Sequence, residues 1–276
     1  MLFRSVGFSD DGNGVVSSKT MYEAMKIASK LDMPIISHSE DKDLVCGGVV
    51  TTGEYGKIHH LPMIDPLSEA LEAERNCLLA YKTGCRLHIC HVSSLDTVRI
   101  VNYYKSLGAN ITVEVTPHQL TLCDMDIQNS NYKMNPPLST PNVRDALVEA
   151  LRNGKIDCIS TDHAPHTKEE KEADLLHAPF GIIGLETAFP VLYTDLVKKG
   201  HLEHKELLTL LNKKPAQIMK LKENKLEVGA DANIVVLDLE TEYEITPDFF
   251  KSKAINSPYI GKKVYGRIEK TYYKGE

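Results

Sequence analysis

The chain has 276 residues, 42% of them hydrophobic, and a formal net charge of −6. This composition is ordinary for a globular protein with a sizeable core, and a net negative charge without a dense Lys/Arg stripe argues against nucleic acid as a partner. No window approaches the run of about 18 apolar residues that a membrane helix requires, so no membrane partner is expected either.

Five short apolar runs predict buried strands, and four of them end in acidic or histidine residues. The four runs are followed by Asp10 and Asp11, by His38, by His91 and by Asp162. The fifth, at residues 111–115, alternates apolar with polar side chains, as strands do. Because helical patterns separate the runs, we expect a (β/α) barrel with a metal site at the C-terminal ends of its strands.

The helical segments are marked by apolar residues that recur every three or four positions. They are predicted at residues 18–31, 67–81, 93–107, 143–152 and 185–219. In residues 67–81 the leucines Leu71, Leu78 and Leu79 are expected on the buried face, and His88 on the following strand is expected to face the helices. We expect Ser93 or Ser94 to cap the third helix, and breaks near Gly200 and Pro215 in the last one.

The pattern changes near residue 222. A turn follows, then a short run of β-forming residues at 234–238, and no helical period is found in the remainder. The sequence therefore predicts two parts, a barrel-type domain at residues 1–222 and a small β-rich segment at residues 223–276.

The cysteines show no CxxC spacing and no density typical of small secreted proteins: Cys46, Cys77, Cys85, Cys90, Cys123 and Cys158. We expect reduced thiols in a cytoplasmic protein. The first residues also lack the apolar core of a secretory leader.

The four strand ends offer the ligands of a hydrolytic metal site. His38 and His91 supply imidazoles, Asp11 supplies a carboxylate that can bridge two ions, and Asp162 can bind a metal or act as a base. A single histidine after a strand is ordinary. Four acid or histidine strand ends in one chain rarely arise by chance, so we favour a metal centre.

The motifs around these residues are similar to those of class I dihydroorotases, a group within the amidohydrolases. The matching stretches are Gly7-Phe-Ser-Asp-Asp-Gly12, His38-Ser-Glu-Asp41, Cys90-His-Val-Ser93, Glu114-Val-Thr-Pro-His118, Lys133-Met-Asn-Pro-Pro-Leu138, Asp157-Cys-Ile-Ser-Thr-Asp-His-Ala-Pro-His166 and Pro179-Phe-Gly-Ile-Ile-Gly-Leu-Glu-Thr187. Each alone is weak, but all of them in order make the resemblance specific.

The resemblance implies roles for individual residues. It makes Asp11 the carboxylate that bridges two zinc ions, in preference to Asp10. It makes His38 and His91 ligands of the second ion, and Asp162 a ligand of the first ion and the general acid/base.

It also implies a substrate and the residues that contact it. The reaction is the reversible closure of N-carbamoyl-L-aspartate to L-dihydroorotate in pyrimidine biosynthesis, with one or two zinc ions as cofactor. Asn135 and His166 match substrate-contacting positions, and Phe180 and Gly181 match the backbone that touches the pyrimidine ring.

The chain departs from the family pattern at its start. The family's first strand carries a His-x-His pair, followed by an arginine for the substrate carboxylate, and neither precedes Asp11 here. We therefore expect about strands 4–8 of an eight-stranded (β/α)8 barrel, as in the C-terminal two-thirds of a dihydroorotase. Its open strand edges would make the chain poorly soluble or lead it to pair with another chain.

Two alternatives stay open. A chain without the His-x-His pair could be a non-catalytic homologue that serves as a structural partner, for example of aspartate transcarbamoylase. The chain could also associate with copies of itself. Another cyclic-amide hydrolase, of the allantoinase or dihydropyrimidinase type, is the second alternative. Those relatives usually carry lysine where Asp11 stands and lack an asparagine equivalent to Asn135, and both features favour dihydroorotase.

Overall fold

The computed structural model describes residues 5–276, which are built around a five-stranded parallel sheet. Its strands, in sheet order, are β1 (Phe8–Ser9), β2 (Ile35–Ser37), β5 (Leu87–Ile89), β6 (Ile111–Val115) and β7 (Cys158–Ile159). Every pairing is parallel, and each strand of this sheet pairs with the next one along the chain. The predicted α/β fold with a parallel sheet is confirmed.

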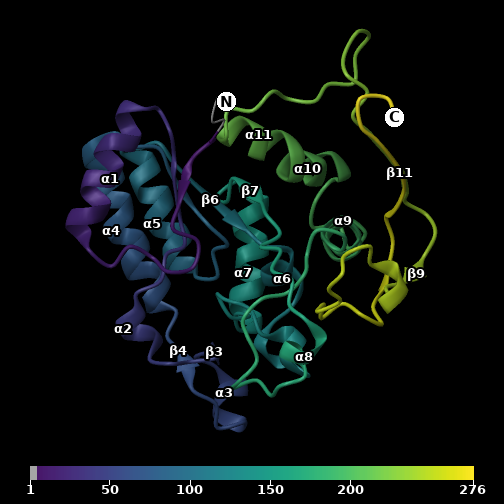
Figure 1. The fold of residues 1–276 in the computed structure, drawn as a ribbon, viewed down its shortest axis with the longest axis horizontal. Coiled ribbons are helices and arrows are strands. Elements are labelled where there is room, and N and C mark those ends of the chain that lie inside the picture. Colours follow the sequence, from purple (N-terminus) through teal and green to yellow (C-terminus); the bar gives the residue numbers. More distant parts are fainter. Residues whose placement is uncertain (1–4) are drawn as a thin grey trace.

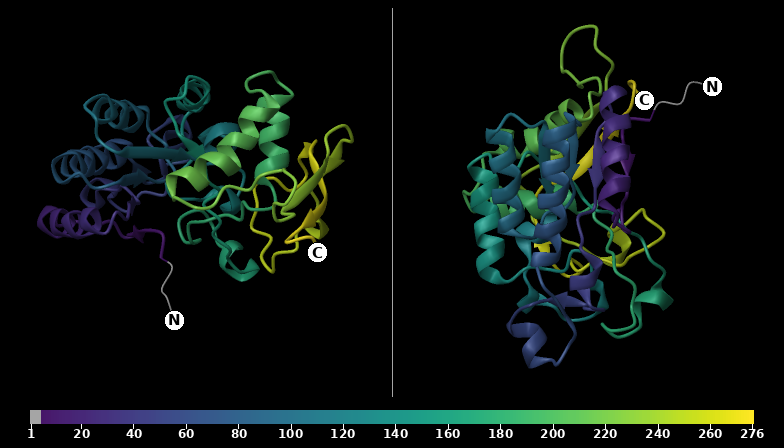
Figure 2. Two further views of the ribbon diagram at one scale, coloured as in Figure 1. Left: turned by 90° about the horizontal axis from the view of Figure 1, so that it is seen from above. Right: turned by 90° about the vertical axis from the view of Figure 1, so that its left-hand side faces the viewer.

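Four long helices connect the strands and pack side by side (Figures 1 and 2). They are α1 (Ser18–Lys30), α4 (Leu67–Thr83), α5 (Leu95–Ser106) and α7 (Pro141–Arg152). In this layer α1 contacts α4, α4 contacts α5, and α5 contacts α7. The helices and one face of the sheet therefore enclose the main apolar core.

The local sequence explains where these elements begin and which side they bury. In α1 the hydroxyl of Ser17 accepts a hydrogen bond from the Thr20 amide, and Met21 and Met25 are buried one turn apart. Of the two predicted caps of α5, Ser93 and Ser94, the cap is Ser94, whose hydroxyl accepts from the Asp96 amide. In β6 the burial alternates along the strand, as a sheet that packs helices on one face requires.

The buried face of α4 differs from the predicted one. Leu71 and Leu78 are 47% and 43% exposed, whereas small residues on the other side of the helix are fully buried. These are Ala70, Ala73, Cys77 and Ala80. Since α4 is packed between α1 and α5, small side chains let the three helices approach closely. The expectation that the leucines form the buried face was wrong for Leu71 and Leu78.

Two segments that carried no periodic signal contain short elements. Residues 39–66 hold α2 (Lys42–Val45), β3 (Val50–Thr51), α3 (Glu54–Ile58) and β4 (Met63–Ile64), with β3 and β4 paired in parallel. Residues 116–141 hold α6 (Pro117–Thr121), η1 (Asp124–Asp126) and η2 (Ser130–Tyr132). Both segments follow strands, and α8 (Lys168–Lys171) likewise follows β7.

The helical region after residue 185 is interrupted once and not twice. The helices α9 (Ala188–Leu192) and η3 (Tyr193–Val197) end before Gly200, which has a φ of 77°. The run of α10 (His204–Leu208), η4 (Thr209–Lys213) and α11 (Lys214–Ile218) then passes Pro215 without a break. The π-helical η4 ends two residues before the proline, and its wider turn accommodates the ring and the missing amide donor.

The remaining strands form two small antiparallel pairs. In one, β8 (Ile234–Asp238) pairs with β11 (Arg267–Tyr272). In the other, β9 (Tyr243–Glu244) pairs with β10 (Lys263–Val264), and η5 (Pro247–Phe249) lies between them in sequence. The domain boundary near residue 222 stays a prediction. Among the residues described, no helix is both long and apolar enough to cross a membrane.

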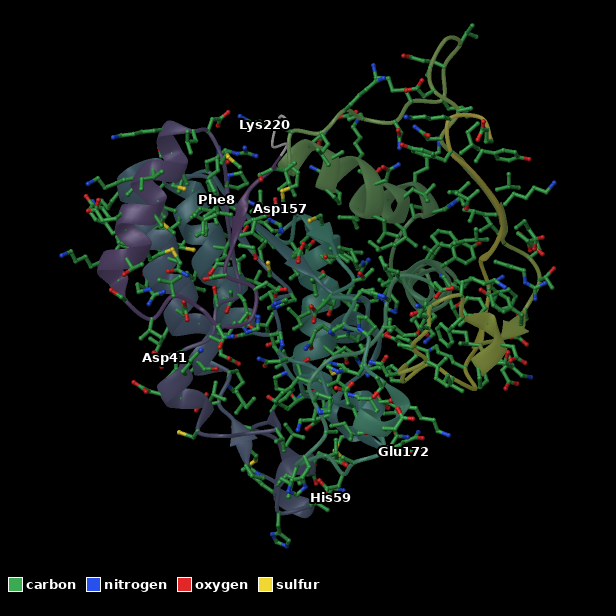
Figure 3. All side chains as sticks on the ribbon, viewed as in Figure 1. Phe8, Asp41, His59, Asp157, Glu172 and Lys220 are labelled. Carbon is green, nitrogen blue, oxygen red and sulfur yellow. The ribbon has the colours of Figure 1, made fainter. Side chains whose placement is uncertain are left out.

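The two ends of the parallel strands lie at opposite sides of the molecule. In Figure 3, Phe8 and Asp157, at or next to the N-terminal ends of β1 and β7, lie in the upper half of the view, below Lys220. Asp41 and Glu172, which follow β2 and β7, lie toward the bottom. The strand-end residues of the predicted site therefore belong to one end of the sheet.

Candidate active site

Three of the predicted metal ligands meet at the C-terminal ends of β1, β2 and β5. One donor atom from each of Asp11, His38 and His91 lies within 4.8 Å of the other two. Nδ1 of His38 is 2.9 Å from Nε2 of His91, and both rings are buried, whereas Asp11 is exposed. Residues 27 and 53 positions apart in the chain thus form one cluster, which we call the strand-end site.

The backbone at His38 is held by carboxylates from both sides. Oδ1 of Asp10 accepts the His38 amide at 2.8 Å. Glu72, from α4, accepts the Glu40 amide at 3.1 Å and an Arg75 guanidinium hydrogen at 2.7 Å. The carboxylate of Asp10 is therefore occupied by the backbone, while its neighbour Asp11 is the one that joins the histidines.

The backbone that follows His91 is held by a second carboxylate of α4. His91 has a φ of 34°, in the left-handed region, which costs energy for a residue with a Cβ. Two residues further on, Glu69 accepts the Ser93 amide at 2.9 Å, the Ser93 hydroxyl at 2.5 Å and the Ser94 amide at 3.2 Å. Burial raises the pKa of Glu69, and these donors oppose that rise.

The protonation state of His91 suits a divalent cation. Burial and the neighbouring His38 lower the pKa of His91 to about 4, so its ring is neutral at pH 7 and has a free lone pair. Its buried Nδ1 has no hydrogen-bond partner among the residues described. Burial disfavours a charged His38, but Glu40, Asp11 and Asp162 raise its pKa overall. Two imidazoles and one carboxylate are a donor set that fits zinc.

Asp162 follows β7 at the edge of this cluster. It has a φ of 48° and lies outside the group whose donor atoms fall within 4.8 Å. Burial, together with the charge of Asp11, raises the pKa of Asp162 to about 6. A carboxyl group with this pKa can both accept and release a proton near neutral pH.

The predicted substrate residues form two groups. Asn135 belongs to the strand-end site, because its Nδ2 donates to Oε1 of Glu40 at 2.8 Å and lies 3.4 Å from Nε2 of His38. His166, Phe180 and Gly181 meet one another, with Nε2 of His166 2.8 Å from the Phe180 carbonyl oxygen. Gly181 has a φ of 129°, and a Cβ there would lie 2.9 Å from Nε2 of His166. Only glycine fits this contact.

Sequence reasoning did not assign roles to the carboxylates that support the site. Glu40 could have been found from its place two residues after His38. Glu69 and Glu72 could not, because on a helix pattern they are ordinary surface glutamates. Their burial shows only once α4 is packed beneath the loops that follow β2 and β5.

His88 corrects another expectation. It belongs to β5, but Leu87 and Ile89 on either side face the helix core, so His88 points to the opposite face of the sheet. There Nδ1 lies 2.7 Å from the Thr112 hydroxyl and Nε2 lies 2.9 Å from Oε2 of Glu114. His88, Glu114 and Cys158 form a second group of potential ligands. Both ring nitrogens are already hydrogen-bonded, so we interpret the group as a polar network beneath the site.

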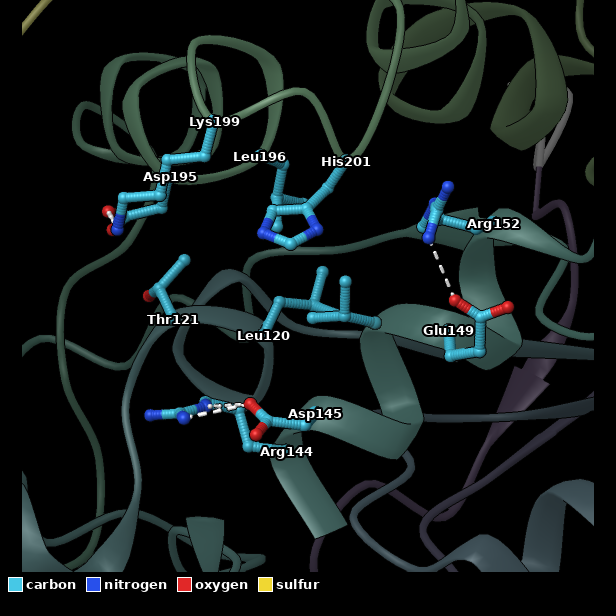
Figure 4. Close-up of a pocket in the computed structure, with 11 residues that line it drawn as sticks. Leu120, Thr121, Arg144, Asp145, Glu149, Arg152, Asp195, Leu196, Lys199 and His201 are labelled. Atoms are coloured by element: carbon cyan, nitrogen blue, oxygen red, sulfur yellow. Dashed lines mark hydrogen bonds and ion pairs between the residues drawn. The ribbon is translucent and has the colours of Figure 1, made fainter. Parts of the chain in front are cut away.

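The strand-end site has only a small cavity, and a larger cavity lies away from it. The cavity beside His38, Glu40 and Asn135 has a volume of only about 20 Å³. A larger one, of about 320 Å³, lies between α7 and the segment around η3 (Figure 4). In its lining Arg144 pairs with Asp145 at 2.8 Å and Arg152 with Glu149 at 2.9 Å. Because these charges neutralise each other, we assign the chemistry to the strand-end site.

Comparison with known sequences identifies similar proteins. The chain is 47% identical over 271 residues to a dihydroorotase of Staphylococcus epidermidis, covering 98% of this chain and 64% of that protein. It is 50% identical over 256 residues to a dihydroorotase of Anoxybacillus flavithermus, covering 92% of this chain and 60% of the relative. The chain thus spans less than two-thirds of the length of these relatives.

Solved structures show the same fold. An L-hydantoinase (dihydropyrimidinase) from Arthrobacter aurescens superposes with a TM-score of 0.82 at 27% identity, over 98% of this chain and 62% of that one. A dihydropyrimidinase from Brevibacillus agri gives 0.82 at 22% identity, over 97% and 61%. The model of the amidohydrolase family matches residues 2–276. The chain belongs to the amidohydrolase family.

Proposed function

We propose that this chain acts as a dihydroorotase, which interconverts N-carbamoyl-L-aspartate and L-dihydroorotate in pyrimidine biosynthesis. The observation that carries the proposal is the convergence of Asp11, His38 and His91 with Asp162 beside them. Identities of 47–50% to relatives named dihydroorotase support this substrate over others.

The proposed cofactor is zinc, as one or two ions held by Asp11, His38, His91 and Asp162. A bound divalent cation would polarise the amide carbonyl and lower the pKa of a water molecule. Asp162 would accept the proton of the attacking water at its carboxylate and return it to the departing ring nitrogen. Its pKa of about 6 suits both steps at neutral pH.

The substrate is an anionic cyclic amide, so its site must offer hydrogen-bond donors. The Asn135 amide lies beside His38, and the His166 imidazole lies beside the Phe180–Gly181 backbone. We propose that Asn135 and His166 bind the substrate carboxylate or carbonyl oxygens. The backbone of Phe180 and Gly181 would contact the ring.

We also propose that the five strands correspond to about strands 4–8 of a (β/α)8 barrel. The consecutive strand order and the open edges at β1 and β7 among the residues described support this reading. We propose that residues 223–276 form a small β-rich part. We also propose that the chain binds a partner, either a second copy of itself or aspartate transcarbamoylase. All six cysteines are free, in line with the proposed cytoplasmic location.

A second candidate function is ring opening of a hydantoin or dihydropyrimidine. The 27% identity and TM-score of 0.82 to the L-hydantoinase favour it. The two candidates share metal chemistry and differ in the substrate carboxylate, which dihydroorotate has and dihydrouracil lacks.

The test is a ring-opening assay on the purified chain after reconstitution with zinc. L-dihydroorotate, hydantoin and dihydrouracil are offered in parallel, and metal content is measured on the same samples. Turnover of L-dihydroorotate alone supports the first proposal, and turnover of the other two alone supports the second. No turnover of any substrate by metal-loaded, folded chain contradicts both and favours the role of structural partner.

A further inference from the structure

One buried asparagine connects the C-terminal part of the chain to the predicted substrate residues. Asn256 lies between η5 and β10 and is only 4% exposed. Its hydrogen bonds all go to residues 164–183, within the segment that follows β7. We call residues 163–184 the site loop, because it carries His166, Phe180 and Gly181.

The amide of Asn256 joins both ends of the site loop. Its Oδ1 accepts the His166 amide at 3.2 Å, and its Nδ2 donates to the carbonyl oxygens of Ala164 and Gly181 at 3.1 and 3.2 Å. An amide hydrogen can only be donated and a carbonyl can only accept, so the orientation of the side chain is defined. The Asn256 carbonyl also accepts the Ile183 amide at 3.0 Å.

The two ends of the loop meet closely at this point. A Cβ on Gly181 would lie 2.7 Å from Cβ of Ala164, so the two ends of the loop are in direct contact there. Nζ of Lys171 is a second donor to the Gly181 carbonyl, at 3.0 Å. The hydrogen bonds of Asn256 therefore help to set the distance between His166 and the Phe180–Gly181 backbone.

We propose that Asn256 is a positioning residue that holds His166 and the Phe180–Gly181 backbone in the arrangement that binds an anionic cyclic amide. Among the residues described, its hydrogen bonds reach none of the four predicted metal ligands. It acts on substrate affinity and leaves metal affinity unchanged. The identity of the ligand rests on the proposed function, whereas the holding of the loop does not.

The test compares Asn256→Asp with a matched control, Asn233→Asp. The first change sets a carboxylate oxygen against two carbonyl oxygens. The second alters a partly exposed asparagine whose side chain, among the residues described, hydrogen-bonds only to Asn224 and Lys274. Hydrogen–deuterium exchange in the site loop should become about tenfold faster in Asn256→Asp. It should stay unchanged in peptides that contain His38 or His91, and in the control.

Ligand binding gives the second readout. The Kd or KM for L-dihydroorotate should rise about tenfold in Asn256→Asp, with kcat within about twofold and zinc affinity unchanged. In a His166→Ala background the same change should add little, because both act through one arrangement. A merely structural role would give the same factor in both backgrounds. If Asn256→Asp does not fold, Asn256→Ser removes the amide without the repulsion and is measured in the same way.

Unchanged exchange in the site loop, or a loosened loop with unaltered affinity for L-dihydroorotate, would overturn the proposal. Wild-type chain that binds no L-dihydroorotate would instead end the proposed function and the ligand assignment with it. The exchange data would then still decide whether Asn256 holds the loop.

Discussion

The strand-end site and the β8–β11 pair are built from the same chain by opposite means. At the site, His38 and His91 are buried, and the carboxylates of Asp10, Glu69 and Glu72 hold the backbone around them. In the β8–β11 pair every residue of β11 is exposed, and much of β8 is exposed as well. These carboxylates have specific hydrogen-bond partners, whereas the apolar side chains of Val235, Val236 and Ile268 in the pair are 44–49% exposed.

This difference predicts where substitutions matter. A buried polar group that loses its partner costs far more than an exposed side chain that changes its chemistry. We therefore expect large and specific effects at the strand-end site, and effects near the detection limit in the β8–β11 pair.

The largest effect is expected for Asp162→Ala. Without the carboxyl group that carries the proton, kcat for ring opening of L-dihydroorotate should fall about 10²- to 10⁴-fold. The fall is measured by steady-state kinetics, and Asp231→Ala, at an exposed position, is the control. Equal activity of the two variants would remove Asp162 from the mechanism.

A large loss of metal is expected for His38→Ala. Since His38 and His91 face each other at 2.9 Å, removal of one imidazole should weaken zinc binding at least about 100-fold. Competition with a chelator measures this directly. His177→Ala, at an exposed position in the site loop, should bind zinc like the wild type. Unaltered affinity in His38→Ala would place the metal elsewhere.

An intermediate loss of stability is expected for Glu69→Ala. The change leaves the buried amides of Ser93 and Ser94 without an acceptor, which should cost about 3 kcal/mol in the free energy of unfolding. Urea denaturation measures it, with the exposed Glu149→Ala as the control. A loss below about 1 kcal/mol would mean that water replaces the carboxylate.

A pH-dependent effect is expected from His118. Burial and the neighbouring His91 lower the pKa of His118 to about 3 in the folded chain, against about 6.5 when unfolded. Above pH 6.5 both states are neutral at this residue. Below it the unfolded state takes up the proton first, so stability should fall toward pH 3 by up to about 1.4 kcal/mol per pH unit. The slope of the free energy of unfolding against pH, between pH 6.5 and 5, should be shallower in His118→Gln than in the wild type. Equal slopes would contradict a lowered pKa of His118 in the folded chain.

The smallest effect is expected in the β8–β11 pair. Val236 is 44% exposed, so Val236→Thr should change the free energy of unfolding by less than about 0.5 kcal/mol. The same substitution at Val113, which is fully buried in β6, should cost about 1–3 kcal/mol. Thermal unfolding of the two variants compares the regions directly. Similar losses would show that the pair is packed in solution.

The elements with a strong period were predictable from sequence. The alternation in β6, the three-and-four spacing in α1 and the Ser94 cap each rest on neighbouring residues, and the structure has them in place. The short elements in residues 39–66 have no such period. Tertiary contacts stabilise them, and such contacts leave no periodic pattern in the local sequence. The buried face of α4 was predicted wrongly from its leucines for a similar reason. Because α4 packs closely against α1 and α5, small residues and not Leu71 or Leu78 lie on its buried face.

The site was predictable as far as its residues follow strands. Asp11, His38 and His91 could be grouped because parallel strands end at one side of the sheet. The supporting residues could not be grouped in this way. Glu69 reaches the site from a helix, and Asn256 reaches the site loop from about 70 to 90 positions along the chain. Contacts over such separations leave no local pattern in a single sequence.

The order of the strands has a consequence for synthesis. Because each strand of the parallel sheet pairs with the next one made, the sheet can grow in the direction in which the chain leaves the ribosome. Asp11, His38 and His91 would then be in place while Asp162 is still to come, so a metal ion could bind before the proton carrier arrives. The loop that Asn256 holds would be fixed only after residue 256 has been made. The nascent chain would gain its metal affinity first and its substrate affinity near the end of translation.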